Sequence, residues 1–588
     1  MRIVKDKIAF AAALIIVVII LSAALAPLIS PYDPLSIELV KAVMGRRWHK
    51  EDKFWSIPTA GLRFLQEQAA RHGIACSLSE KVRAALNLGQ RIHTELDAAK
   101  ADETPLSLPT ATQLMPFQFA GVRFTKTALH NFHGVMIADD MGLGKTVQAL
   151  SIVAMHPKLQ QVLVLCPNTL KYTWAGEIEK HYPQLSYTVI DGDKKLRPEQ
   201  WTADSLIKIC NYELLLRDVE PRLTEWDLVI GDEIANMLKS YKAKRTKLSK
   251  KLRRRYTIGL CGIPLENRLE ELHSVMDFIM PGLLGSGWIF MQQHIVKNDY
   301  GIPIGYRGLD QVRQRIAPYY IRRTKAEVLP ELPAKVYNDV NIEMSAAEWE
   351  LYKIIRQQII DKIAGNPKLT VSNILVEMLR LKQATSDPRL LDVPEIESSK
   401  VAAIKDMLEA AEGHKVVLFT QFAQLATLLG QDFDAPVIQG SVSAKDRAQI
   451  IADFQNDGQQ VLVSTDAGAY GITLTAADII CHIDMAWNPA KMRQREDRLH
   501  RIGRPCIFCG KSVITEDRIC TDTKAKGANC KASTVQVVTL LCRRTVDEKV
   551  RSILHKKLQL IKDVLDEDNP EELSTKMTKG DLMELLED

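Results

Sequence analysis

Short aliphatic runs alternate with amphipathic stretches twice along this chain, and this pattern limits the fold more than any other feature. The first series lies between Leu114 and about Gly285 and includes VLVLCP, WDLVI and YTIGLCG. The second begins at about Ser398 and includes KVVLFTQF, QQVLVSTDAG, DIICHIDMAW and VQVVTLL. Buried parallel strands joined by crossover helices produce this pattern. We therefore expect an α/β fold with two doubly wound parallel-sheet lobes and a mostly helical insert between them.

The length and the charge of the chain limit the number of domains and the ways in which it could bind nucleic acid. The chain has 588 residues, which suggests three or four domains at roughly 150 residues each. The net charge of +5 is small for this size, so any nucleic-acid binding must come from local patches. The expected segments are an apolar start (1–45), a small module (46–95), a first lobe (111–285), a helical insert (286–397), a second lobe (398–570) with an insertion (506–530), and an acidic tail (571–588).

The stretch IADDMGLGKT, residues 137–146, has the composition of a phosphate-binding loop. Such a loop needs glycines so that backbone N–H groups face the phosphate, a lysine to neutralise charge, and a hydroxyl for Mg²⁺. These residues are present as Gly142, Gly144, Lys145 and Thr146. The generic pattern has a glycine six residues before the lysine, where this chain has Asp139, so the motif alone leaves a chance match open.

Two further groups indicate phosphoryl transfer. Asp232 and Glu233 follow the apolar run WDLVI, where one carboxylate can hold Mg²⁺ and the other can polarise the attacking water. In the second series, QREDRLHRIGR places Arg498 and Arg501 on one face of a predicted helix, suited to reach a γ-phosphate across a cleft. A solvated face is the alternative for an arginine-rich helix. We expect ATP and Mg²⁺ as cofactors.

These motifs, in this order, closely resemble those of the Snf2-type ATPases of helicase superfamily 2. The resemblance covers about 450 residues and rests on LMPFQFAGVRF, DDMGLGKT, VLVLCPNTLKYTWAGEI, PLENRLEEL, YYIRRTKAEVLPELPAK, STDAGAYGITLTAADIICHIDMAWNPA, QREDRLHRIGR and TVDEKV. Residues 46–90 resemble, more weakly, the substrate-recognition module of the annealing-helicase (HARP-type) branch. The resemblance implies two RecA-like lobes and ATP-driven translocation along duplex DNA without conventional strand unwinding.

The resemblance also implies a role for residues of both lobes at the nucleotide. Gln118 would contact adenine, and Asp232 and Glu233 would be the carboxylates for Mg²⁺ and water. The phosphates and Mg²⁺ would be held by Gly142, Gly144, Lys145 and Thr146. The sensors and arginine fingers of the second lobe would be Gln494, Arg498 and Arg501. Gly471 would let the backbone of the second lobe approach the nucleotide.

Duplex or forked DNA is the expected partner of a monomeric protein. By resemblance, the residues near the DNA strand would be Asn168, Thr169, Ser464, Thr465, Trp487 and Asn488. The run KSYKAKRTKLSKKLRRR, residues 239–255, has ten basic residues and no acid, which favours contact with phosphates. Its candidate contacts are Lys242, Lys244 and Arg245. A solvated surface is the alternative for this run, and contact with the backbone would carry no sequence preference.

The chain departs from the family pattern next to the carboxylates. The family usually has Asp-Glu-Ala-His, whereas here the pair is followed by Ile234, Ala235 and Asn236. The family's TGTPLENR is here CGIPLENR, so Cys261 and Ile263 replace two hydroxyl residues. We expect hydrolysis to survive and its coupling to lobe movement to be weakened or rewired. Decay to a DNA-binding scaffold is the alternative.

Four cysteines lie within 25 residues, in CIFCGKSVITEDRICTDTKAKGANC. The spacing C-x2-C-x10-C-x9-C fits four thiolates around a structural Zn²⁺. The predicted ligands are Cys506, Cys509, Cys520 and Cys530, in a zinc-ribbon-like insertion that would add a DNA or protein contact. Four unrelated thiols are the alternative. The other six cysteines are scattered singly and indicate reduced core thiols.

Residues 8–30 carry no charge and are long enough to span a bilayer as a helix. Ala24, Leu25 and Ala26 would also suit a signal peptidase. With its tail LAPLISPYDP, the segment resembles the first membrane helix of dipeptide-type ABC transporter permeases. Export would separate an ATP-using protein from ATP. We therefore expect a cytoplasmic protein with either an N-terminal membrane anchor or a fused or misassigned start.

Overall fold

The computed structural model describes a large part of the chain. The described residues are 16–19, 47–49, 54–58, 71, 80–262, 269–297, 303–329, 332–364, 371–456, 458–466, 472–486, 489–501, 504–506 and 532–552. The chain divides into two compact units, residues 1–102 with 126–132, and residues 103–125 with 133–588.

The first unit contains a small antiparallel sheet, one long helix and the last residues of α5 (Pro116–Asn131). The sheet has the strand order β1-β3-β2 and is formed by β1 (Ile16–Ile19), β3 (Phe54–Pro58) and β2 (Arg47–His49). The helix α4 (Glu80–Ala101) follows. The four described residues of the predicted membrane segment are therefore in a strand, which suits their β-branched sequence IVVI. In the described part of the chain, no helix is both long enough and apolar enough to cross a membrane.

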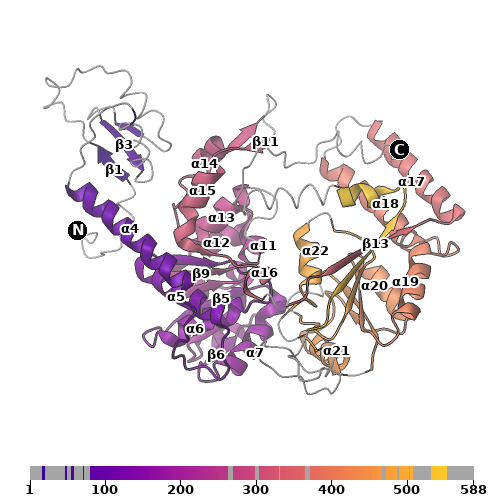
Figure 1. The fold of residues 1–588 in the computed structure, drawn as a ribbon, viewed down its shortest axis with the longest axis horizontal. Helices are drawn as coiled ribbons and strands as arrows, with labels where there is room; N and C mark the ends of the chain where they lie inside the picture. Colours follow the sequence, from indigo (N-terminus) through magenta and orange to yellow (C-terminus); the bar gives the residue numbers. More distant parts are fainter. Residues whose placement is uncertain are drawn as a thin grey trace. The chain divides into compact units, whose positions relative to one another are not determined.

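The second unit begins with a seven-stranded parallel sheet in the order β12-β4-β9-β8-β5-β7-β6. Its strands are β4 (Gly134–Ile137), β5 (Val162–Cys166), β6 (Tyr187–Val189), β7 (Ile207–Asn211), β8 (Glu225–Gly231), β9 (Arg253–Leu260) and β12 (Tyr320–Ile321). Strand β5 is buried along its whole length, as its unbroken aliphatic run predicts, and β4 is buried along its whole length as well. Figure 1 shows α6 and α7 beside this sheet.

The helices of this first lobe connect successive parallel strands or cover the sheet. They are α5 (Pro116–Asn131), α6 (Lys145–Met155), α7 (Lys171–His181), α8 (Arg197–Thr202), α9 (Leu214–Arg217), α10 (Glu220–Leu223), α11 (Ile234–Leu238), α12 (Lys244–Lys250), α13 (Leu269–Ile279), α14 (Gly287–His294), α15 (Leu309–Ile316) and α16 (Lys325–Val328). A short hairpin of β10 (Ile295–Lys297) and β11 (Pro303–Tyr306) follows α14. The carboxyl ends of parallel strands share one edge, so the loops that follow β4, β5 and β8 meet there.

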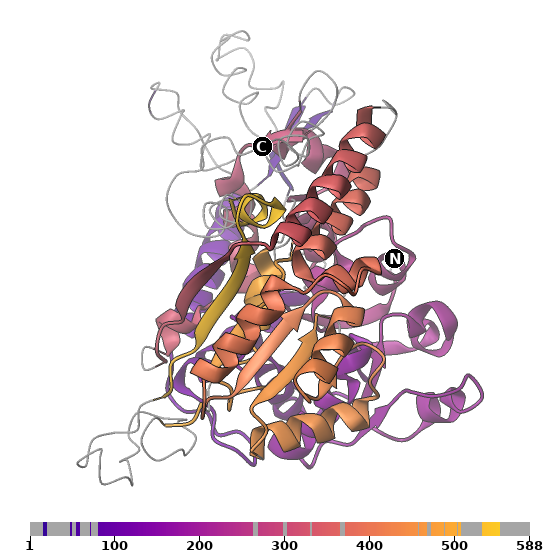
Figure 2. The same cartoon turned by 90° about the vertical axis from the view of Figure 1, so that its right-hand side faces the viewer.

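A second parallel sheet has the order β13-β18-β17-β14-β16-β15. Its strands are β13 (Val336–Ile342), β14 (Val416–Thr420), β15 (Val437–Ile438), β16 (Val461–Thr465), β17 (Ile479–His482) and β18 (Gln536–Cys542), and its helices are α17 (Ala346–Ala364), α18 (Val371–Ser386), α19 (Ser399–Ala410), α20 (Ala423–Asp432), α21 (Ala444–Asn456) and α22 (Pro489–Glu496). Figure 2 shows strands of this sheet side by side, with helices of the same lobe across them. The two predicted parallel-sheet lobes are confirmed.

The boundaries of the predicted helical insert, 286–397, are wrong at both ends. Strand β12 pairs with β4, which extends the first lobe to Ile321, and β13 pairs with β18, which begins the second lobe at Val336. Strand β13 was not predicted from the sequence, because its first six residues are exposed and the strand therefore has no buried aliphatic run. Helices α17 and α18 pack into one core cluster with residues of the second lobe, including Met485 and Leu541.

Candidate nucleotide site and nucleic-acid interface

The predicted phosphate loop connects β4 to the first turn of α6. Gly142 has φ 90° and Gly144 has φ 76°, a left-handed conformation that strongly favours glycine. Lys145, the first residue of α6, donates from Nζ to the carbonyl oxygens of Asp139 (2.8 Å) and Asp140 (3.2 Å). The ammonium thus lies over its own loop, at the N-terminal end of a helix where backbone N–H groups favour anions. The donors present, with Thr146 next in the same turn, fit a bound phosphate.

Asp139, which stands where the generic pattern has glycine, is a buried anchor of this loop. Arg323 donates from Nε to its Oδ1 at 3.0 Å and from a terminal nitrogen to its Oδ2. Gln148 of α6 also donates to Oδ2, at 3.0 Å. The same arginine donates to the carbonyl oxygen of Phe117, beside Gln118. Arg323 was not predicted from the sequence, where the pair of arginines in YYIRRTK was the available signal.

Gln118 lies against the phosphate loop. It is buried, its Oε1 accepts from the Met115 N–H at 2.9 Å, and its Nε2 donates to the Leu143 carbonyl at 3.1 Å. A Cβ placed on Gly144 would come within 2.3 Å of the same Nε2. The glycine is therefore required both by its backbone angle and by this close approach. The adenine contact of Gln118 stays a prediction.

The two predicted carboxylates follow the carboxyl end of β8. Asp232 is 9% exposed; its Oδ2 accepts from Trp174 Nε1 at 2.9 Å and its Oδ1 accepts from the Glu233 N–H at 2.9 Å. Burial, together with the charge of Glu233, raises the pKa of Asp232 to about 6, while Trp174 and Lys145 act in the opposite direction. Glu233 has φ 50°, a strained angle for a residue other than glycine and one often found at functional sites. Carboxylate oxygens at this edge suit Mg²⁺.

The second lobe brings Arg501 to the phosphate loop. A Cβ on Gly142 would lie 2.9 Å from Arg501 Cγ, so the arginine stem covers the glycine. Arg501 also donates to Thr473 Oγ1 at 2.8 Å. Burial and the charge of Arg498 lower the pKa of Arg501 to about 9, against the opposing charges of acidic residues that include Glu233. The loop, the carboxylates and this arginine therefore share one site.

The placement of the arginines on a helix face was wrong in detail. Helix α22 ends at Glu496, so it carries Gln494, which is half-buried, but neither Arg498 nor Arg501. The chain continues in turns, with the His500 N–H donating to the Glu496 carbonyl at 3.0 Å. Arg498 is 3% exposed.

A buried ionic network that was not predicted from the sequence holds these turns. Lys335 donates to Glu496 at 2.8 Å and to Asp497 at 3.0 Å, and Lys325 donates to Asp497 at 2.8 Å. Burial opposes ionisation of Glu496, but the charge of Lys335 outweighs it and lowers the pKa of Glu496 to about 2. The pKa of Asp497 is lowered further, by Lys325 and Lys335. Both lysines belong to the segment that connects β12 to β13, so this connection is fixed to the arginine-bearing turns.

The predicted DNA-facing residues differ in exposure. Asn168, which is exposed, and Thr169, which is half-buried, begin a 3-10 helix (Asn168–Leu170) after β5. Ser464 and Thr465, at the end of β16, are 0% and 4% exposed, so neither reaches the surface in this arrangement. The remaining residues assigned to the DNA or to the nucleotide backbone, Trp487, Asn488 and Gly471, lie outside the described residues.

The three predicted DNA contacts in the basic run, residues 239–255, differ in their surroundings. Lys242 and Lys244 are exposed, and Lys242 Nζ lies 5.8 Å from the centre of the Tyr241 ring. Arg245 instead donates to the Met237 carbonyl at 2.9 Å and pairs with Glu213 at 3.3 Å. It therefore has a structural role whether or not DNA binds.

Of the four predicted zinc ligands, Cys506 is buried and forms an isolated antiparallel bridge with Ala532. The other three, Cys509, Cys520 and Cys530, lie outside the described residues. No group of three or more potential metal ligands occurs in the described part of the chain. The scattered thiols that are described, Cys166, Cys210, Cys261, Cys481 and Cys542, are all buried, as predicted.

Two positions at which this chain departs from the family's motifs, Ala235 and Cys261, are buried. Ala235 is 4% exposed, and Cys261, 1% exposed, donates from Sγ to Met136 Sδ at 3.7 Å. The neighbouring Gly262 lies close to the phosphate loop, since a Cβ on it would be 3.8 Å from Lys145 Nζ. The segment that carries Cys261 therefore still contacts the nucleotide site. Ile263 lies outside the described residues.

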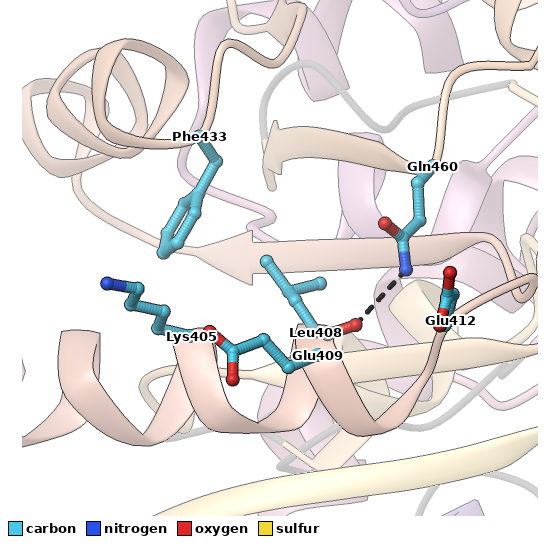
Figure 3. Close-up of a pocket in the computed structure, with 6 residues that line it drawn as sticks. All are labelled: Lys405, Leu408, Glu409, Glu412, Phe433 and Gln460. Atoms are coloured by element: carbon cyan, nitrogen blue, oxygen red, sulfur yellow. Dashed lines mark hydrogen bonds between the residues drawn. The ribbon is translucent and has the colours of Figure 1, made fainter.

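A separate pocket of about 360 Å³ lies on the second lobe, beside α19 (Figure 3). Gln460 spans one side of it, donating to the Leu408 carbonyl at 3.2 Å. None of the predicted nucleotide or DNA residues lines this pocket. Its lining residues are Lys405, Leu408, Glu409, Glu412, Phe433 and Gln460.

Models of two known protein families match residues of the two lobes. The family model of the SNF2-related domain matches residues 117–390, and that of the helicase conserved C-terminal domain matches residues 399–503. A third, the N-terminal TM domain of oligopeptide transport permease C, matches residues 1–41.

Individual proteins are also similar to this chain. An uncharacterized ATP-dependent helicase of Mycoplasma genitalium is 30% identical over 502 residues, which cover 82% of this chain and 45% of the relative. The chromodomain-helicase-DNA-binding protein 1-like of Danio rerio is 29% identical, over 78% of this chain and 44% of its own. The Sulfolobus solfataricus SWI2/SNF2 ATPase core in complex with dsDNA is 29% identical, over 78% and 94%, with a TM-score of 0.38. The chain spans about half the length of the curated relatives it matches.

Proposed function

Because the chain carries an SNF2-related domain followed by a helicase C-terminal domain, it is a Snf2-type member of helicase superfamily 2, and we propose that it is a DNA-dependent ATPase. In this proposal, ATP turnover drives translocation along duplex or forked DNA. The outcome would be reannealing of strands or displacement of bound protein. The observation that carries the proposal is the position of Arg501 over Gly142, with Asp232 and Glu233 in the same site.

The residues of the first lobe suit Mg-ATP. The N–H groups at the start of α6 and the ammonium of Lys145 would bind the phosphates, with the lysine leaving its two loop carbonyls. Thr146 and Asp232 would hold Mg²⁺, which neutralises developing charge on the transferred phosphoryl group. Glu233 would orient the attacking water and accept its proton.

The second lobe would complete the site. Arg501, and Arg498 beside it, would stabilise the charge that develops on the γ-phosphate. The buried pairs of Lys325 and Lys335 with Glu496 and Asp497 would keep both arginines aimed at the cleft. Electrostatic preorganisation of this kind costs no reorganisation during the reaction.

Duplex DNA as partner is supported by basic and polar residues of the first lobe that are exposed or, for Thr169, half-buried. Lys242 and Lys244 would contact phosphates, and Asn168 and Thr169 would contact one strand. Ser464 and Thr465 would reach DNA only after the second lobe rearranges, because both are buried here. These contacts would give affinity for the backbone rather than for a sequence.

Three finer assignments belong to the same proposal. The small module at residues 46–95 would direct the enzyme to forked DNA, in the manner of the annealing-helicase branch. The insertion at 506–530 would hold one structural Zn²⁺ through its four cysteines. The protein would act as a monomer in the cytoplasm, and residues 8–30 would be either a membrane contact or a fused start.

A catalytically weakened DNA-binding scaffold is the second candidate. The replacement of the family's histidine by Ala235 and of a hydroxyl residue by Cys261 favours it. One assay separates the two candidates: ATP turnover measured without DNA and with single-stranded, duplex and forked DNA. Turnover stimulated by duplex or forked DNA supports the enzyme, and DNA binding without turnover on any of the three supports the scaffold.

A further inference from the structure

Helix α7 begins directly after the turn that carries Asn168 and Thr169, and Trp174 is its fourth residue. At 1.5 Å per residue, Trp174 lies about 8 Å along the axis from Thr169. Its side chain is 1% exposed, and its indole Nε1 donates to Asp232 Oδ2 at 2.9 Å. One continuous helical segment therefore joins the proposed DNA-contact turn to a carboxylate of the nucleotide site.

A second connection runs between the same two places. Asn211, the last residue of β7, donates from Nδ2 to Asn168 Oδ1 at 2.8 Å. The next residue, Tyr212, is fully buried and donates from its hydroxyl to the carbonyl oxygen of Asp232 at 2.8 Å. The turn at 168–169 is thus linked to the side chain of Asp232 through Trp174 and to its backbone through Tyr212.

Both carboxylate oxygens of Asp232 are held. Trp174 occupies one lone pair of Oδ2, and the Glu233 N–H occupies one of Oδ1. An ionised carboxylate has about four acceptor positions, so each oxygen keeps a lone pair for Mg²⁺ or for a water bound to it. Partners that orient a metal-binding carboxylate in this way commonly change metal affinity 10- to 100-fold when removed.

We propose that Trp174 is a positioning residue that holds Asp232 for the divalent cation and, with Tyr212, makes that position sensitive to DNA at Asn168 and Thr169. The proposal rests on the function proposed above. It provides a coupling route that does not use position 235, where this chain has Ala235 instead of the family's histidine. Because coupling between two binding sites is reciprocal, the factor by which DNA tightens metal-nucleotide binding equals the factor by which metal-nucleotide tightens DNA binding.

The first test measures metal binding without turnover. Mn²⁺ binding is followed by electron paramagnetic resonance on the full chain, in the presence of a non-hydrolysable ATP analogue. Trp174→Phe keeps an aromatic ring but removes the N–H donor, and we expect it to weaken Mn²⁺ binding about 10-fold or more. The matched control is Trp201→Phe, which removes the same kind of bond, Trp201 Nε1 to Asp218 Oδ2 at 3.0 Å, elsewhere in the same lobe. The control should bind Mn²⁺ as the unaltered protein does.

The second test measures coupling. The ratio of Mn²⁺ affinities with and without duplex DNA is determined for the unaltered protein, Trp174→Phe, Tyr212→Phe and Trp201→Phe. We expect the ratio to fall toward one in the first two variants and to stay unchanged in the third. The reciprocal ratio, DNA affinity with and without the Mn²⁺-analogue complex, should fall by the same factor.

Unchanged Mn²⁺ affinity and an unchanged ratio in Trp174→Phe would overturn the proposal. If that variant does not fold, as judged by its circular dichroism, 3-benzothienylalanine at position 174 replaces it, since this residue has the shape of tryptophan but no N–H. Failure of the proposed function is distinct: the unaltered protein would then bind no metal-nucleotide complex or would show no coupling to DNA. A loss of affinity equal in Trp174→Phe and Trp201→Phe would indicate general destabilisation and would also contradict the proposal.

Discussion

Arg323 and Asp139 lie 184 residues apart in the chain and form a bidentate ion pair under the phosphate loop, with Arg323 12% exposed and Asp139 fully buried. The arginine follows the last strand of the first lobe, while the aspartate precedes α6. The pair therefore fixes the loop to the segment that leads into the second lobe. It also explains why this loop can have an acidic residue where the generic pattern has glycine.

The first prediction concerns this pair. Arg323→Met removes the charge but keeps much of the stem, leaving Asp139 buried without its cation, and we expect a loss of about 3–5 kcal/mol in the free energy of unfolding. Chemical denaturation followed by circular dichroism measures it. Arg253→Met is the control, because Arg253 is 65% exposed and lies 4.0 Å from Glu225. That control should change stability by less than about 0.5 kcal/mol. Equal losses in the two variants would contradict the role of the buried pair.

The second prediction concerns Lys335. Lys335→Met leaves Glu496 buried without its cation and should cost about 3–5 kcal/mol of stability, measured by denaturation. The exposed pair of Lys353 and Glu350 provides the control, since Lys353→Met should cost under about 0.5 kcal/mol.

The same pair predicts a pH dependence. The pKa of Glu496 is lowered to about 2 in the folded protein, against about 4.3 in an unfolded chain. Its contribution is therefore present above about pH 4 and lost as pH falls through about 2. Lys335→Met should lose less stability over this range than the unaltered protein does. A steeper loss in the variant would show that Lys335 does not lower the pKa of Glu496.

The third prediction concerns the insertion. Cys506 and Ala532 are bridge partners, so their Cα atoms are about 5 Å apart and a two-residue turn can join them. Arg504 holds the base of the insertion by donating to the Ser533 carbonyl at 2.7 Å and to the Ala477 carbonyl at 2.9 Å. Replacing residues 507–531 by two glycines should keep the lobe folded and remove about one equivalent of zinc, measured by elemental analysis.

In the full-length chain, the double change Cys506→Ser, Cys509→Ser should remove the same equivalent. Metal content that survives either change would show that the four cysteines are not its ligands. Loss of the folded second lobe on excision would show that the insertion is part of its core.

The fourth prediction concerns the basic run. Changing both Lys242 and Lys244 to Ala should weaken duplex binding about equally for all sequences. It should also reduce the slope of log affinity against log salt by about 2, because each phosphate contact contributes roughly 0.9. The control changes Lys194 and Lys195, another exposed pair of the first lobe, and should leave the slope unchanged. An unchanged slope in the first variant would place the DNA contact elsewhere.

The sequence predicted those parts of the fold that depend on local pattern. Strands β5, β14 and β16 lie in apolar runs named in the sequence analysis and are buried along their whole length, so a local pattern was enough to find them. Strand β13 is exposed over most of its length and was missed for that reason. The end of α22 before Arg498 was also missed, since a run of polar residues does not indicate where a helix stops.

The residues of the candidate site divide in the same way, into those that a local motif identifies and those that it does not. Lys145, Asp232 and Glu233 could be found because each belongs to a short motif with a known chemical requirement. Arg323, Trp174 and the lysines at 325 and 335 act across distances of 58 to 184 residues, and no local pattern identifies their partners. Ser464 and Thr465 were assigned to DNA by resemblance to the family. A match of motifs does not show whether a side chain is buried in a given arrangement of the lobes.

The most direct test of the account is ATP turnover by the unaltered protein and by Glu233→Gln, each with and without duplex or forked DNA. The substitution keeps size and polarity but removes the charge that activates water, so kcat should fall by orders of magnitude while ATP still binds. Lys145→Ala should instead weaken ATP binding and turnover together. We expect turnover in the unaltered protein that DNA stimulates, though less than in a family member with the intact histidine. Turnover no higher than that of Glu233→Gln on every DNA would contradict the account and leave the DNA-binding scaffold as the function.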